Sequence, residues 1–260
     1  MRLVLPALVL VPVLAMTTPA DDKKDPAKDT RVYEMRVYSA APGKLDALHA
    51  RFRDHTTKLF EKHGMTNVGY FVPVGENKDS KLVYFLAYPR KEAREKSWKA
   101  FVADPDWKKA AADSEKDGKL VAKVEQKFLA ATDYSPPLKI GPGKAARVFE
   151  LRTYTATKGN LAALDARFRD HTIKLFEKHG MTNMVYWHLL PDEKGADVTL
   201  VYLLAHESPD AAKKSFDTFR QDPDWVKART DSETKAGGSL TEKDGVKSEF
   251  LQPTDYSPLK

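Results

Sequence analysis

The stretch at residues 50–67 reads ARFRDHTTKLFEKHGMTN, and residues 166–183 read ARFRDHTIKLFEKHGMTN, differing only where Thr57 becomes Ile173. The match continues outward on both sides: RVYEMRVY at 31–38 aligns with RVFELRTY at 147–154, LVYFLAY at 82–88 with LVYLLAH at 200–206, and FLAATDYSP at 128–136 with FLQPTDYSP at 250–258. The offset grows from 116 to 122 residues, and the added residues fall in Gly-containing polar stretches typical of loops. We therefore expect two tandem domains, at residues 31–134 and 147–256, joined by a Pro- and Gly-containing linker at 135–146.

Each copy has the pattern strand, helix, strand, strand, helix, strand. Strands are predicted at 31–38, 65–74, 82–88 and 124–129, because these segments alternate or are rich in Val, Tyr and Phe. A helix is predicted from Leu45 to the His63–Gly64 end, another after Pro89, and a further one from Asp104, which precedes Pro105 as an N-cap. This order predicts an α+β fold of two tandem ferredoxin-like (βαββαβ) domains. Their open sheet faces can bury each other, so we expect them to form an intramolecular dimeric α/β barrel.

Residues 1–20 differ in character from the rest. Met1 and Arg2 precede an apolar run at 3–16, followed by the small residues of Thr18-Pro19-Ala20. This pattern predicts a cleaved secretory signal peptide, and hence an exported protein that is periplasmic or secreted. The alternative is an uncleaved membrane anchor, but the run is shorter than the roughly 20 apolar residues that a span requires. No membrane span is expected after cleavage.

Composition excludes several classes of site. The 260 residues are 42% hydrophobic and 31% charged, which is typical of soluble globular domains. The net charge of +6 comes from interspersed charges rather than blocks, so no nucleic-acid partner is predicted. The absence of cysteine excludes disulfides, thiolate metal ligands and cysteine nucleophiles. No metal or cofactor is predicted, since no metalloprotease, phosphate-loop or dinucleotide motif occurs.

The first strand of each copy carries the main candidate pocket residues, on the face that alternates with Tyr33, Met35 and Val37. They are Glu34, Arg36 and Tyr38 in the first copy and Glu150, Arg152 and Tyr154 in the second. We expect the apolar face to meet the helices and the charged face to point into the barrel. There the arginines could bind an anionic group. The alternative, which we favour, is that neighbouring Glu and Arg side chains pair and hold the barrel register.

His55 and His171 are the other candidates that both copies share. They lie at helical spacing with Leu48, Phe52 and Leu59, so we expect the imidazoles to face the sheet. A histidine on an apolar face is usually a hydrogen-bonded core residue, and a ligand or acid–base role is the alternative. Histidines without a histidine in the other copy are set aside, namely His49, His188 and His206.

Four motifs together resemble the NIPSNAP family. They are EMRVY at 34–38, LFEKHG at 59–64, VYFLAY at 83–88 and the segment from Trp98 to Trp107, repeated at 150–154, 175–180, 201–206 and 216–225. The resemblance covers nearly all of the chain after the signal segment. It implies a dimeric α/β-barrel fold and no particular reaction. The second copy departs from the pattern where Phe216 replaces Trp98 and His206 replaces Tyr88.

Two functions follow from these observations. The first is a binding protein that holds a small apolar or anionic ligand, or a protein partner, through the barrel. The alternative is an enzyme of the dimeric α/β-barrel type, monooxygenase-like or haem-handling, with its site between the two sheets. The expected state is a monomer with an internal pseudo-dimer, for which further oligomerisation is possible.

Overall fold

The computed structural model describes residues 29–141, 143 and 147–260. The predicted signal segment at 1–20 and linker residues 142 and 144–146 lie outside this range. The first half consists of β1 (Val32–Ala40), α1 (Leu45–Arg51), η1 (Phe52–Thr56), α2 (Thr57–Lys62), β2 (Thr66–Pro73), β3 (Lys81–Tyr88), α3 (Lys91–Ala103), α4 (Pro105–Ser114) and β4 (Val121–Ala131). The second half repeats this order as β5 (Val148–Ala156), α5 (Leu161–Arg167), η2 (Phe168–Thr172), α6 (Ile173–Lys178), β6 (Thr182–Leu189), β7 (Thr199–His206), α7 (Pro209–Gln221), α8 (Pro223–Ala236) and β8 (Thr241–Pro253).

Local sequence signals account for the helix ends. The Asp104 side chain accepts a hydrogen bond from the backbone N–H of Asp106, as expected of an N-cap. Gly64 has φ +76°, the left-handed conformation that ends the preceding helix. The helix predicted from Leu45 onward is interrupted by the π-helical turns η1 and η2, which the α-helical spacing did not predict.

The strands close into one barrel in the order β1-β3-β2-β8-β5-β7-β6-β4. Each half contributes a four-stranded antiparallel sheet in the ferredoxin-like order, for example β4-β1-β3-β2. Two short seams join the halves: residues 71–73 pair with 251–253, and residues 129–131 pair with 187–189. The intramolecular dimeric α/β barrel of two tandem ferredoxin-like domains is therefore confirmed.

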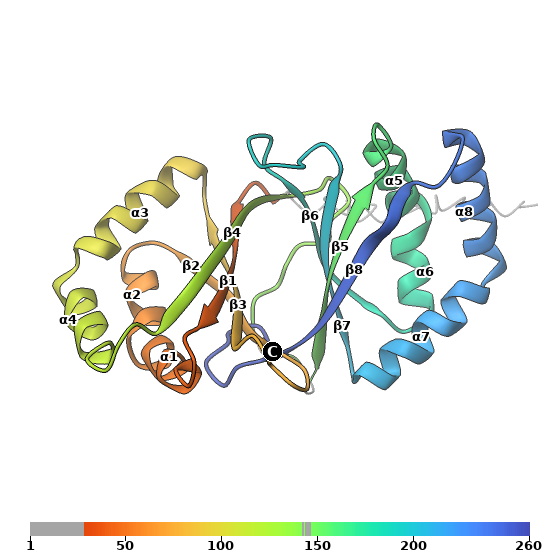
Figure 1. The fold of residues 1–260 in the computed structure, drawn as a ribbon. Helices are drawn as coiled ribbons and strands as arrows, with labels where there is room; N and C mark the ends of the chain where they lie inside the picture. The colour runs from red at the N-terminus through yellow and green to blue at the C-terminus, as the bar shows by residue number, and fades with distance from the viewer. Residues whose placement is uncertain (1–28, 142, 144–146) are drawn as a thin grey trace, which may run out of the picture.

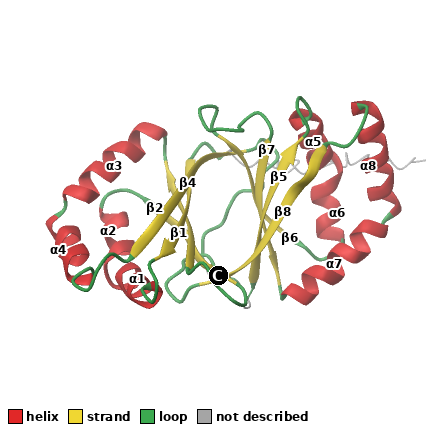
Figure 2. Ribbon diagram, in the orientation of Figure 1, coloured by secondary structure: helices red, strands yellow, loops and turns green. Residues whose placement is uncertain are grey.

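The helices cover the outside of the barrel in two groups, one beside each sheet (Figures 1 and 2). Each group packs on its own sheet through a separate apolar cluster, with Leu48, Phe60 and Phe101 in the first half and Leu164, Phe176 and Phe219 in the second. The central strands β3 and β7 are thus buried on one face by helices and on the other by the barrel interior, whereas much of β4 and β8 is exposed. Among the residues described, no helix has the length and apolar character needed to cross a membrane.

Aromatic side chains from both halves fill part of the barrel interior. Trp187 stacks on Phe85 with ring centroids 5.3 Å apart and lies 5.4 Å from Tyr33. Phe71 meets Phe149 edge-on at 5.1 Å. Each of these contacts joins one half to the other, so the interior of the barrel is a single shared core.

The segments after β4 and β8 cross over and pack against the opposite half. Tyr134, which follows β4, donates a hydrogen bond of 2.6 Å to the Asp165 carboxylate in the second half. Tyr256, which follows β8, hydrogen-bonds His49 Nδ1 at 2.8 Å in the first half. His49 and Asp165 occupy equivalent positions of the two copies. In each copy, the residue at this position hydrogen-bonds the tyrosine of the segment that crosses over from the other half.

These segments also fill one end of the barrel. Leu138 and Leu259 are buried in the shared core, and Figure 2 marks the C-terminus between the two sheets. The Arg147 Nε donates to the Lys260 carbonyl at 3.2 Å, which places the C-terminus beside the start of β5. Access to the barrel interior is therefore from the opposite end, where β1 and β5 finish.

Candidate functional site

The charged face of β1 and β5 lies under the helices and does not point into the barrel. Met35 and its counterpart Leu151 belong to the shared barrel core, whereas Tyr38 packs on the helix-side cluster. The expectation that Glu34, Arg36 and Tyr38, with Glu150, Arg152 and Tyr154, face the barrel interior was therefore wrong. These residues do lie together in each half, but between the sheet and the helices.

The charged face of β1 and β5 lies under the helices for an electrostatic reason. An ionised side chain buried in the barrel would face mainly the apolar residues of the other sheet, at a large desolvation cost. On the helix side, α3 supplies Arg94 and Trp98 within hydrogen-bond distance of Glu34. Alternation along β1 could not reveal the orientation, because both faces of the strand are buried.

Glu34 is the centre of the first buried polar cluster, and its side chain is 0% exposed. It accepts hydrogen bonds from Arg36 Nη1 at 2.6 Å, Arg94 Nη2 at 2.9 Å, Tyr88 Oη at 2.9 Å and Trp98 Nε1 at 3.1 Å. Burial alone would raise the pKa of Glu34, but the hydrogen bonds and charges of the two arginines outweigh it and hold the pKa below its usual value. The cluster is saturated with protein donors, so it has the character of a structural ion network.

The second cluster is built differently around Glu150. His206 replaces Tyr88 and places Nε2 3.1 Å from Glu150, and Ser248 and Arg152 also donate to this carboxylate. Burial again opposes ionisation, but the His206 hydrogen bond and the Arg152 charge hold the pKa of Glu150 below its usual value. Setting His206 aside for lack of a histidine in the first copy therefore missed a buried contact, although the replacement of Tyr88 in a matched strand was the signal for it.

His55 and His171 do not face the sheet, and that expectation was wrong. Both side chains are exposed, whereas the next residues, Thr56 and Thr172, are buried. The Thr56 hydroxyl donates to the Arg51 carbonyl, five residues back, because η1 has a wider turn than an α-helix. The wider turn rotates the histidine toward solvent, where it lines a surface groove against α4 in the first half and α8 in the second.

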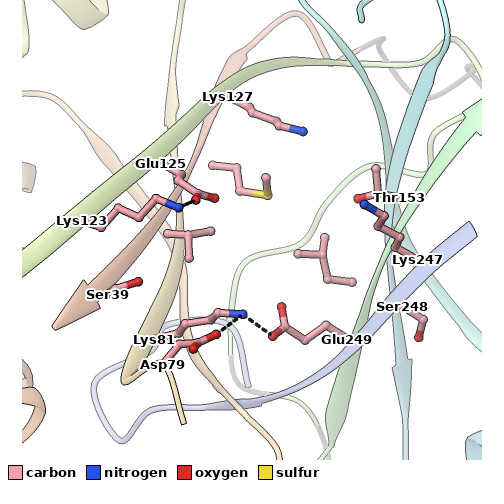
Figure 3. Close-up of a pocket in the computed structure, with 13 residues that line it drawn as sticks. Ser39, Asp79, Lys81, Lys123, Glu125, Lys127, Thr153, Lys247, Ser248 and Glu249 are labelled. Carbon is pink, nitrogen blue, oxygen red and sulfur yellow. Dashed lines mark ion pairs between the residues drawn. The ribbon is translucent and has the colours of Figure 1, made fainter. Parts of the chain in front are cut away.

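A cavity of about 700 Å³ lies between the two sheets, at the end where β1 and β5 finish. Its inner wall includes Met35 and Val37 of β1 with Leu151 and Thr153 of β5. These residues are on the strand faces that we expected to meet the helices. The other lining residues are polar or charged, namely Ser39, Asp79, Lys81, Lys123, Glu125, Lys127, Lys247, Ser248 and Glu249. Figure 3 shows side chains of both sheets around the opening, among them those of Lys81, Lys127 and Glu249 projecting into it.

Several of the charged residues neutralise each other across or along the opening. Lys81, at the start of β3, lies 3.5 Å from Glu249 of β8 and 3.3 Å from Asp79. Lys123 pairs with Glu125 along β4. The first of these contacts joins the two halves (Figure 3). The cavity thus combines an apolar wall with a charged rim. The rim was not predicted from the sequence, because its position depends on how β3, β4 and β8 come together in the barrel.

No cluster of three His, Cys, Asp or Glu side chains that could hold a metal occurs in the described ranges. The polar groups that line the cavity are lysines, carboxylates and hydroxyls. An arrangement of this kind can bind and orient an organic ligand through its charge and its apolar body.

Comparison with solved structures agrees with the barrel. An anthrone oxidase-like protein aligns with 87% of this chain and 92% of its own length, at 16% identity and a TM-score of 0.56. A monooxygenase-like protein from Lactobacillus acidophilus aligns with 86% of this chain and 94% of its own, at 10% identity and a TM-score of 0.50. At these identities the likeness shows the fold alone.

Shorter relatives align with one half at a time. A NIPSNAP-like domain protein from Burkholderia xenovorans covers 42% of this chain with 92% of its own length, at 20% identity and a TM-score of 0.37. No curated protein matches the chain by sequence. The NIPSNAP family model, in contrast, matches twice, at residues 33–136 and 149–258. The chain belongs to the NIPSNAP family, of which it carries two domains in tandem.

Proposed function

We propose that the protein binds a small organic molecule in the barrel cavity, with the apolar part of the ligand against the inner wall. The observation that carries the proposal is the cavity itself. Its volume of about 700 Å³ lies within the range of roughly 300–1,000 Å³ found for small-molecule sites. Apolar Met35, Val37 and Leu151 would contact the ligand body, and the charged rim would contact its polar end.

The buried clusters around Glu34 and Glu150 are poorer binding sites. Their carboxylates already accept hydrogen bonds from protein groups on several sides. A ligand that entered there would have to replace these bonds and would leave arginines unpaired. The barrel cavity requires no such exchange.

The test uses a neutral fluorescent probe, N-phenyl-1-naphthylamine, whose emission rises in apolar surroundings. We expect it to bind the wild-type protein and to bind Thr153→Trp at least about ten-fold more weakly, a loss of about 1.4 kcal/mol. The added indole occupies the cavity next to Leu151. Val102→Trp is the matched control, because Val102 is exposed on α3, away from the cavity. Unchanged probe binding by Thr153→Trp, with an unchanged unfolding midpoint, would contradict the proposal.

The second candidate is an enzyme of the monooxygenase or haem-handling type acting in the same cavity. It is favoured only by the whole-chain likeness to an anthrone oxidase-like protein at a TM-score of 0.56. The direct assay is the oxidation of anthrone by O₂ to anthraquinone and water, followed by absorbance, with Thr153→Trp as the comparison. Adding haem and recording a Soret band tests the other activity. A rate above the uncatalysed one that Thr153→Trp abolishes would favour the enzyme.

We also propose that the protein is exported through its first 20 residues. Support comes from Arg2, the apolar run at 3–16 and the small residues at 18–20. Expression of the full chain followed by cell fractionation and N-terminal sequencing tests this. A start near Asp21 in the exported fraction is expected, and an intact N-terminus inside the cell would contradict it.

A further inference from the structure

The cavity lining carries an uneven set of charges. Its lining contains four lysines but only three carboxylates. The carboxylates of Glu125 and Glu249 each lie in an ion pair, with Lys123 and Lys81 respectively. In the described part of the chain, neither Lys127 nor Lys247 has a carboxylate within the 4.0 Å limit of an ion pair. The cavity lining therefore has one more positive than negative side chain, and two of its lysines take part in no ion pair with the residues described.

Internal duplication explains why Lys127 is left without a partner. The strand registers place Lys127 opposite Met35 and Glu249 opposite Leu151, so the two residues occupy equivalent positions. Glu249 pairs with Lys81, which stands at the start of β3. The residue equivalent to Lys81 is Thr199, at the start of β7. The Thr199 side chain is uncharged and cannot form an ion pair. The ion pair present on one side of the cavity is thus absent on the other.

Of the two lysines that take part in no ion pair, Lys127 is the better placed to bind a ligand. It is half-buried, whereas Lys247 is exposed at the rim. Its neighbour across the β1–β4 ladder is Met35, part of the apolar wall. Figure 3 shows its side chain projecting into the space between the sheets. An ammonium group beside an apolar surface in a concave site attracts an anion more strongly than one on an open surface.

We propose that the ligand is an amphipathic organic acid whose carboxylate binds the Lys127 ammonium and whose apolar body lies on Met35, Val37 and Leu151. This inference rests on the proposed binding function and adds the charge and the orientation of the ligand. Because Glu249 stands at the equivalent position across the barrel, the acid binds in one direction and not in the reverse one.

Three ligands with the same eight-carbon chain test the charge: octanoate, octanol and octylamine, each used to displace N-phenyl-1-naphthylamine at pH 7.5 and low salt. We expect octanoate to bind about ten-fold more tightly than octanol, equivalent to about 1.4 kcal/mol, and octylamine to bind most weakly. Added salt should weaken octanoate binding and leave octanol binding unchanged, because salt screens charge and not apolar contact.

Variants then locate the charge. Lys127→Gln should bind octanoate no better than octanol, and Lys127→Glu should prefer octylamine. Lys243→Gln is the control, since Lys243 carries the same charge on β8 but does not line the cavity. It should keep the wild-type preference for octanoate.

Failure of the inference about charge and failure of the proposed binding function give different results. Equal binding of octanoate and octanol by the wild type would overturn the inference while leaving the binding function intact. An octanoate preference that survives in Lys127→Gln would also overturn it. Failure of all three ligands and of the neutral probe to bind would overturn the proposed function itself.

Discussion

Replacing Glu34 by alanine tests the structural role of the first buried cluster. Glu34 is fully buried and accepts hydrogen bonds from two arginines, a tyrosine and a tryptophan. Its removal leaves Arg36 and Arg94 without a carboxylate, and a guanidinium cannot lose its charge at ordinary pH. The Arg36 side chain is only 9% exposed, so water cannot replace the lost partner.

The expected cost is about 3–5 kcal/mol, the usual range when one partner of a buried ion pair is removed. Glu150→Ala should cost at least about 1 kcal/mol less, because the second cluster holds one arginine where the first holds two. Arg94 is replaced there by Ala212, and the groups that contact Glu150 besides Arg152 are His206 and Ser248. Arg94→Ala combined with Glu34→Ala should therefore be less destabilising than the sum of the two single changes.

Urea unfolding followed by circular dichroism measures these differences as shifts of the midpoint at constant slope. Glu92→Ala is the matched control, since Glu92 is exposed on α3 and should leave the midpoint unchanged. A loss below about 1 kcal/mol for Glu34→Ala, or strict additivity with Arg94→Ala, would refute the account of the cluster.

Acid should remove the same stabilisation. The folded-state pKa of Glu34 lies below the ordinary value of 4.5, so its contribution is complete above pH 4.5 and is lost as the pH falls through the folded pKa. The stability difference between wild type and Glu34→Gln should therefore be constant near neutral pH and shrink below pH 4.5. A stability difference that grows as the pH falls would contradict a lowered pKa for Glu34.

Three further substitutions test the packing by the same urea assay. Trp187→Ala should cost about 3–5 kcal/mol because it leaves a void in the core shared by the halves; a loss below about 2 kcal/mol would argue against a shared core. Gly69→Ala should cost about 1–3 kcal/mol because a Cβ there would lie 2.6 Å from the Phe71 ring, whereas Gly238→Ala, with open space around it, should be neutral. Tyr134→Phe should cost about 1.5 kcal/mol or more by removing the hydrogen bond to the Asp165 carboxylate, and no change would mean that the crossing segment does not hold the halves together.

The barrel was predictable from the sequence because its signals are local or repeated. Asp104 with Pro105 and the left-handed Gly64 mark helix ends that depend only on neighbouring residues. Because the second copy repeats the pattern of the first, the sequence also predicts the second sheet. The turn at Phe52–Thr56 was not predictable, since one wider turn leaves the apolar spacing nearly intact and only rotates the residue between, His55.

The lining of the cavity was harder to predict than its place between the sheets. Both faces of β1 are buried. The alternation of Glu34 and Met35 therefore shows that the two residues lie on opposite faces, but not which face meets the helices and which faces the barrel interior. The choice depends on Arg94, which is distant in sequence and belongs to a helix. The rim depends on contacts between halves, such as that of Lys81 with Glu249, and no pattern within one copy encodes it.

Fusion of the two domains allows a site that a homodimer of either domain could not form. A two-fold axis through a homodimeric barrel would place identical side chains on opposite sides of the cavity. In this chain the equivalent positions hold Lys127 and Glu249, and the next pair inverts the order with Glu125 and Lys247. Opposite charges at equivalent positions give the cavity a direction, and a ligand with distinct polar and apolar ends can then bind in one orientation. Exchanging the pair, as Lys127→Glu with Glu249→Lys, should therefore preserve the net charge of the cavity and reverse the orientation of a bound acid.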